Sequence, residues 1–127
     1  MNLYATVFVD ADLSEDQLRS LLAMRFGGRI DRFDVVDDTL EISVRGNDDY
    51  HPPQERTSSE DAFLFFRFRL EVNPSATTTD EAVIHRVGQL LEALWSSGAQ
   101  AVASCDFEHL LPRAGGFDWK GMSREQP

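Results

Sequence analysis

The chain has 127 residues, of which 42% are hydrophobic, and this fits one domain with one core because domains cluster near about 100–150 residues. No stretch approaches the roughly 18 consecutive apolar residues that cross a bilayer. The first residues also lack the basic and then apolar pattern of a signal peptide. We therefore expect a cytoplasmic protein that does not bind membranes.

The formal charge of −10 is concentrated in one quarter of the chain. Residues 31–61 contain ten acids and three arginines, a net −7. Such a segment repels nucleic acids and anionic membranes, whereas it attracts a basic protein. A solvated acidic surface that serves only solubility remains an alternative.

The first half of the chain predicts a strand, a helix and one or two further strands. Residues 3–9 alternate with the two-residue period of a strand that has one apolar face. Ser14 and Gln17 have the spacing of a capping box, which predicts a helix that ends at Gly27-Gly28. Residues 31–36 and 39–45 are short extended segments that form either a small hairpin or one bent strand.

The second half predicts a loop, a strand, a helix and a last strand. Residues 46–61 have no periodicity and are rich in turn-forming residues, so they predict a long exposed loop. All even-numbered positions of residues 62–72 are apolar, which predicts a third strand. Thr78 and Glu81 predict a second capping box, at the start of a helix that ends at Gly98, and residues 100–107 predict the last strand.

This order of elements predicts an α+β fold of the ferredoxin-like βαββαβ type. Both helices are expected on one face of an antiparallel sheet, with an extra hairpin near residues 30–45 as an option. We expect a single domain over residues 1–112. Residues 113–127 are expected to form a tail, for which packing on the open face of the sheet is one option.

The open face of the predicted sheet carries an aromatic and basic set of residues. If left in water, its aromatic side chains form an unusually large apolar patch, so something is expected to cover them. The alternatives are the tail with Phe117 and Trp119 as anchors, a second copy in a homodimer, or a different protein. Nucleic acid is not expected, because the third strand lacks the glycines of RNA-recognition modules and the chain is acidic. The set is Tyr4, Phe8, Phe63, Phe65, Arg67 and Arg69.

The sequence offers no clear catalytic chemistry. The histidines His51, His85 and His109 lack the spacing of a metal site or of a nucleophile and its base. Cys105 alternates with small apolar residues, which is typical of an inert core cysteine. We therefore predict no catalytic residue, no metal site and no cofactor.

Residues 104–117, SCDFEHLLPRAGGF, resemble the C-terminal segment of small acidic bacterial proteins that are uncharacterised, and the strand followed by PRAGG carries this resemblance. In size, acidity and helix–sheet composition the chain is also similar to the immunity proteins that inhibit secreted bacterial toxins. That second resemblance implies an acidic surface that binds a basic toxin and no enzymatic activity.

Two functions are therefore expected as alternatives. The first is a non-enzymatic, immunity-type binding protein that occludes a basic partner, with Tyr50 as the aromatic anchor of its contact set. The second is a homodimer, either a ligand-binding protein or an enzyme, that encloses a small anionic ligand, held by Arg67 or Arg69, between two open sheet faces. The contact set of the first is Asp37, Asp38, Asp48, Asp49, Tyr50 and Glu60.

Overall fold

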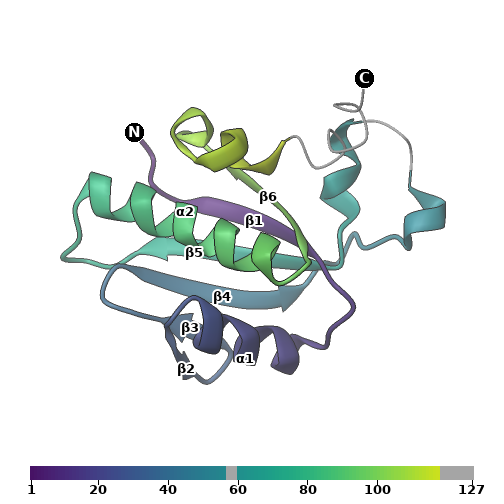
Figure 1. Ribbon diagram of the computed structural model, residues 1–127, viewed down its shortest axis with the longest axis horizontal. Helices are drawn as coiled ribbons and strands as arrows, with labels where there is room; N and C mark the ends of the chain where they lie inside the picture. The colour runs from purple at the N-terminus through teal and green to yellow at the C-terminus, as the bar shows by residue number, and fades with distance from the viewer. Residues whose placement is uncertain (57–59, 118–127) are drawn as a thin grey trace.

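The structure, a computed structural model, describes residues 1–56 and 60–117 and has one antiparallel sheet with two helices on one face (Figure 1). The expected α+β class is confirmed. The strands are β1 (Ala5–Asp10), β2 (Arg29–Asp31), β3 (Asp34–Val36), β4 (Leu40–Gly46), β5 (Phe68–Pro74) and β6 (Gln100–Cys105). The α-helices are α1 (Glu15–Arg25) and α2 (Asp80–Ser96), and the 3-10 helices are η1 (Pro53–Glu55), η2 (Glu60–Phe65), η3 (Glu108–Leu110) and η4 (Pro112–Gly116).

The sheet has six strands in the order β2-β3-β4-β5-β1-β6, and every neighbouring pair is antiparallel. This strand order differs from that of the expected four-stranded ferredoxin-like sheet, because residues 29–36 add two short strands at one edge. Of the two alternatives for residues 31–45, the hairpin is observed, since Asp34 of β3 lies opposite Ser43 of β4.

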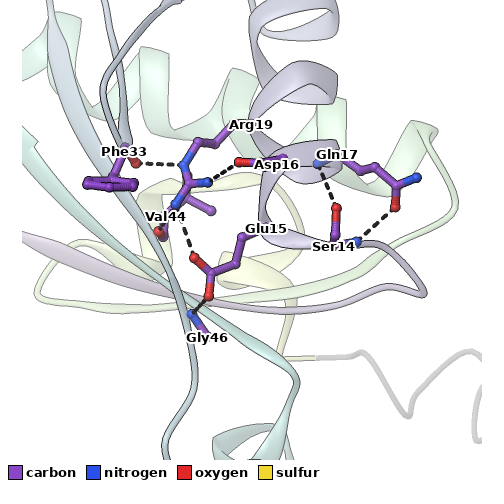
Figure 2. Close-up of polar contacts among 8 residues, drawn as sticks. All are labelled: Ser14, Glu15, Asp16, Gln17, Arg19, Phe33, Val44 and Gly46. Atoms are coloured by element: carbon purple, nitrogen blue, oxygen red, sulfur yellow. Dashed lines mark hydrogen bonds and ion pairs between the residues drawn. The ribbon is translucent and has the colours of Figure 1, made fainter.

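The helix starts are set by side-chain caps. The predicted capping box of α1 is confirmed, because the Ser14 hydroxyl accepts from the Gln17 N–H and the Gln17 side chain accepts from the Ser14 N–H (Figure 2). The second cap was predicted one residue early: α2 is capped by Thr79, whose hydroxyl accepts from the Ala82 N–H at 3.2 Å. Neighbouring threonines are equally good caps by residue type, so the sequence did not distinguish Thr78 from Thr79.

The main core lies between the helices and the sheet. The inward side chains of β1 and β5 alternate as predicted, and each fully buried aliphatic side chain contributes about 1.5–3 kcal/mol. The residues of β1 and β5 that are buried in this core are Ala5, Val7, Val9, Phe68, Leu70 and Val72, and those of the helices include Leu18, Leu22, Val83, Val87, Leu90, Leu91 and Leu94.

The prediction of a strand over the whole of residues 62–72 was wrong, because the strand begins at Phe68 and residues 60–65 form η2. A 3-10 turn brings residues three apart onto one side. Phe63 and Phe66 are thereby both buried against Phe8 and Val102 on the sheet face opposite the helices. Residues 62–66 were expected to form part of the open face of the sheet. Instead, Phe63 and Phe66 of this segment cover part of that face.

The segment after β6 packs on the edge of the sheet. A Cβ added at Gly116 would lie 2.3 Å from the Ala101 carbonyl oxygen, and one at Gly115 would lie 3.1 Å from the Ala103 carbonyl oxygen. Both glycines have positive φ. The Phe117 ring then reaches the Phe63 ring at 5.3 Å, whereas Trp119, the other expected anchor, lies outside the described residues.

Among the residues that the structure describes, no helix combines the length and the hydrophobicity needed to cross a membrane.

Candidate interaction surfaces

The acidic turn, which we define as residues 47–50, follows the end of β4. It is built on Asn47, whose side chain is buried although it is polar. The Asn47 amide donates to the carbonyls of Leu64 and Phe66 at 2.9 and 2.8 Å, and its backbone N–H donates to the Arg67 carbonyl at 2.9 Å. These bonds tie the turn to η2 and to the chain that enters β5.

The acidic turn is also closed internally. The Asn47 side-chain oxygen accepts from the Asp49 N–H at 3.1 Å, and the Asn47 carbonyl accepts from the Tyr50 N–H at 3.0 Å. Asp48 and Asp49 are exposed, and neither carboxylate has a hydrogen bond or an ion pair with any described residue. Two free negative charges are therefore displayed on a backbone that has little freedom to move.

Arg56 anchors the loop behind the turn. Its side chain is only 6% exposed and makes two hydrogen bonds to Asp10, at 2.9 and 3.1 Å, and a third to the His51 carbonyl at 2.7 Å. The guanidinium lies 5.8 Å from the Tyr50 ring centroid and 5.2 Å from that of Phe66. Most described residues of the predicted loop over residues 46–61 are exposed as expected, but the buried Arg56 side chain ties this loop to the end of β1.

A second buried arginine fixes the base of the turn (Figure 2). Arg19 donates to the carbonyls of Phe33 and Val44 and pairs with Glu15 and Asp16 of its own helix. The other carboxylate oxygen of Glu15 accepts from the Gly46 N–H at 3.0 Å. Helix α1 thus holds the last residue of β4, from which the acidic turn starts.

The remaining members of the expected contact set do not join this turn. Asp37 and Asp38 lie at the opposite end of β4, and a strand of seven residues separates its ends by about 20 Å. Glu60 is the first residue of η2, and its side chain lies outside the described part. The structure therefore brings together Asp48, Asp49 and Tyr50 and leaves the two aspartates of the β3–β4 turn apart.

Asp37 is engaged within the molecule. Burial by itself raises the pKa of Asp37, but hydrogen bonds from the N–H groups of Leu40 and Thr39 and from Arg86 outweigh it and leave that pKa below its ordinary value. The Arg86 Nε lies 2.7 Å from its carboxylate. Asp37 thus closes the β3–β4 turn and links it to α2, while Asp38 is exposed.

The expected open-face aromatics are largely covered. Phe8 and Phe63 are buried with their ring centroids 5.4 Å apart, and Phe65 lies edge-on against His51 at 4.7 Å. Tyr4 alone of these aromatics is exposed on the open face, at 59%.

The two open-face arginines already have carboxylate partners. Arg67 pairs with Asp12 at 3.5 Å, and Arg69 pairs with Glu71 at 2.7 Å. The Arg69 guanidinium also lies 5.6 Å from the Phe8 ring centroid. An anionic ligand there would compete with Asp12 and Glu71.

Cys105 is half-buried. Burial raises the pKa of its thiol to about 11, and the nearby charges of Glu108 and Asp106 act in the same direction. His85 is exposed on α2. Within residues 1–56 and 60–117, no group of three or more His, Cys, Asp or Glu side chains is placed to hold a metal ion.

Asn47, Arg56 and Arg19 are the residues that sequence reasoning missed. Each binds partners distant in the sequence, and no local periodicity reports such contacts. The one available signal was Arg56, an isolated arginine in a segment rich in acids, because arginine is the residue that favours buried ion pairs.

No protein-family model matches the chain, and neither the curated proteins nor the solved structures contain a significantly similar one.

Proposed function

We propose that this protein is a non-enzymatic binding protein of the immunity type, which docks a basic protein partner on its acidic turn. The observation that carries the proposal is that Asp48, Asp49 and Tyr50 are displayed on a turn held by two buried polar side chains, Asn47 and Arg56.

A rigid acidic turn suits this role for three physical reasons. Its carboxylates attract a basic partner and speed the encounter. Its backbone is already ordered, so binding loses less conformational entropy. Tyr50 is 40% exposed and rests on Arg56, so it offers an aromatic anchor, a side-chain type that often dominates interface energies.

The test is a kinetic binding measurement between the full chain and the protein encoded by the neighbouring gene, at 0.1 and 1 M salt. We expect a complex whose association slows at high salt, since the Debye length falls from about 10 Å to about 3 Å over that range. The Asp48→Asn/Asp49→Asn variant should reproduce part of the loss at low salt. Tyr50→Ala should weaken binding by about 2 kcal/mol, mainly through faster dissociation.

The matched control is Asp31→Asn/Glu41→Gln, which removes two exposed charges from β2 and β4. It should leave the association rate nearly unchanged. A neighbouring gene product that forms no complex, or an association rate that is the same for both double variants, would overturn the proposal.

The second candidate, a homodimer with an enclosed anionic ligand, receives less support. Phe8 and Phe63 already bury one another within a single chain, and Arg69 is paired with Glu71. A dimer that depends on the open face would therefore have to rest on Tyr4 and on polar side chains.

We also infer that the fold is a ferredoxin-like βαββαβ core extended by one hairpin. The support is the contiguous order β4-β5-β1-β6 with β1 and β5 in the middle, α1 following β1, and α2 connecting β5 to β6. Strands β2 and β3 are the extension, added before β4.

A further inference from the structure

A groove of about 670 Å³ runs between α2 and the chain segment that follows β6. Figure 1 shows this segment, in yellow-green, lying beside α2. One wall is a stripe of α2 that includes Ile84 and Gly88, and the other wall is Leu110 with Leu111 and Pro112. This hollow is larger than the others described for residues 1–56 and 60–117.

The wall opposite α2 is rigid. Its backbone is fixed by hydrogen bonds from Leu110 to the Phe107 carbonyl and from Leu111 to the Glu108 carbonyl, both at 3.0 Å. Phe107 and Leu111 are themselves buried in the main core. Leu110 nevertheless remains 51% exposed, so a large apolar side chain is held in water by an ordered turn.

The two walls of the groove approach closely at Gly88, because this residue has no side chain. A Cβ added there would lie 3.1 Å from Pro112 Cδ. Gly88 is buried on α2, where a glycine costs about 1 kcal/mol relative to alanine, and here it lets Pro112 pack directly on the helix.

The charges that line the groove are acidic. Glu81 and Glu92 lie on the α2 stripe eleven positions apart, which places them about 16 Å from each other along the helix, with His85 between them. Among the described residues, no lysine or arginine lines the groove. An apolar channel with a carboxylate toward each end complements a helix that has one apolar face and basic flanks.

We propose that this groove binds a basic amphipathic helix, about three turns long, of a partner protein. A second copy of the chain fits less well because it carries the same charge of −10. The surface is separate from the acidic turn, and the inference does not depend on that turn.

The test uses a synthetic 14-residue helical peptide of leucine, lysine and alanine, with its leucines on one face, and measures its binding to the full chain by fluorescence anisotropy. We expect the peptide to bind at least tenfold more tightly than a peptide of the same composition whose leucines are spread around the helix. Leu110→Asp should weaken binding at least tenfold. Glu81→Gln/Glu92→Gln should weaken it and flatten its dependence on salt.

Two controls keep the outcome interpretable. Leu110 is exposed, so Leu110→Asp should melt at the wild-type temperature, and Asp31→Asn/Glu41→Gln, which removes two exposed charges from β2 and β4, should bind the peptide as the wild type does. Equal binding of the two peptides, or unchanged binding by Leu110→Asp, would show charge attraction without a groove site and would overturn the inference. A peptide that binds as expected while the acidic turn fails its own test would separate this inference from the proposed function.

Discussion

Asp10 and Arg56 are 46 residues apart and form a bidentate ion pair that joins the end of β1 to the loop behind the acidic turn. The Asp10 carboxylate also accepts from the Arg67 N–H at 3.2 Å, so three donors from two segments converge on it. The Arg56 and Asp10 side chains are 6% and 18% exposed. The Asp10 carboxylate therefore holds the loop and the chain that enters β5 against the end of β1.

We expect Asp10→Asn to destabilise the protein by about 3–5 kcal/mol, because it leaves the buried Arg56 charge without its partner. Asp10→Leu/Arg56→Met should recover part of that loss. The measurement is urea unfolding at pH 7. Asp12→Asn is the matched control, since it breaks an exposed pair with Arg67 and should cost less than about 1 kcal/mol. Equal costs for Asp10→Asn and Asp12→Asn would show that the buried pair does not organise the loop.

Gly116→Ala should be more damaging than Gly98→Ala, although both glycines have a φ close to +90°. The backbone alone makes each alanine unfavourable by about 1–2 kcal/mol. At Gly116 the new Cβ also meets the Ala101 carbonyl at 2.3 Å, whereas at Gly98 it meets nothing within 4 Å. Thermal unfolding of both variants should show an additional loss of about 1–3 kcal/mol for Gly116→Ala. If both variants melt together, η4 does not pack closely on β6.

Asp37→Asn should lower stability by about 1–2 kcal/mol at pH 7, because the amide keeps the bonds from Thr39 and Leu40 but loses its charge opposite Arg86. The pKa of Asp37 is lower in the folded protein than the ordinary value of about 3.9. Its contribution is therefore present above about pH 4 and is lost as the pH falls through the folded pKa.

Urea unfolding of Asp37→Asn and wild type at pH 7 and at acid pH checks this dependence. The stability gap should narrow on acidification. Asp38→Asn at the neighbouring exposed position should change stability by less than about 0.5 kcal/mol. A gap that is constant with pH would contradict the role assigned to the Asp37 charge.

Cys105 should react slowly with thiol reagents in the folded protein. With its pKa raised to about 11, about one thiol in a thousand is ionised at pH 8. Because Cys105 is the single cysteine, labelling with a chromogenic disulfide reports on it alone. We expect labelling to be far faster in urea and to speed up about tenfold per pH unit in the native state. Rapid stoichiometric labelling of the native protein at pH 7 would refute this.

The sequence predicted the elements whose side chains alternate between one core and solvent. Helix α2 and the residues of β1 other than Phe8 follow this rule, and the limits of both elements were found to within two residues. Residues 62–66 broke it, because apolar side chains there fill a second, smaller core on the other sheet face. The sequence of an alternating apolar run looks the same whether the chain forms a strand or, as here, a 3-10 turn. The side chains of this turn pack on the sheet face opposite the helices.

The sequence predicted which types of residue form the candidate surfaces. It did not predict where all of these residues lie in the fold. Asp48, Asp49 and Tyr50 were expected to act together and do lie on one turn. Asp37 was grouped with them because it is close in sequence and acidic, yet it pairs with Arg86, which is 49 residues away. Long-range pairing of this kind is decided by the fold, so composition could not separate internal acids from displayed ones.

The glycine pair at the end of η4 also bears on how copies of this chain can polymerise. Pro112–Gly116 lies along β6, whereas β2, at the other edge, has no further strand beside it among the described residues. Fibre growth by strand pairing requires two open edges on every molecule. Since the described residues leave one edge open, such pairing would join two copies and then stop, and the charged Arg29 and Asp31 of the three-residue β2 weaken even that contact.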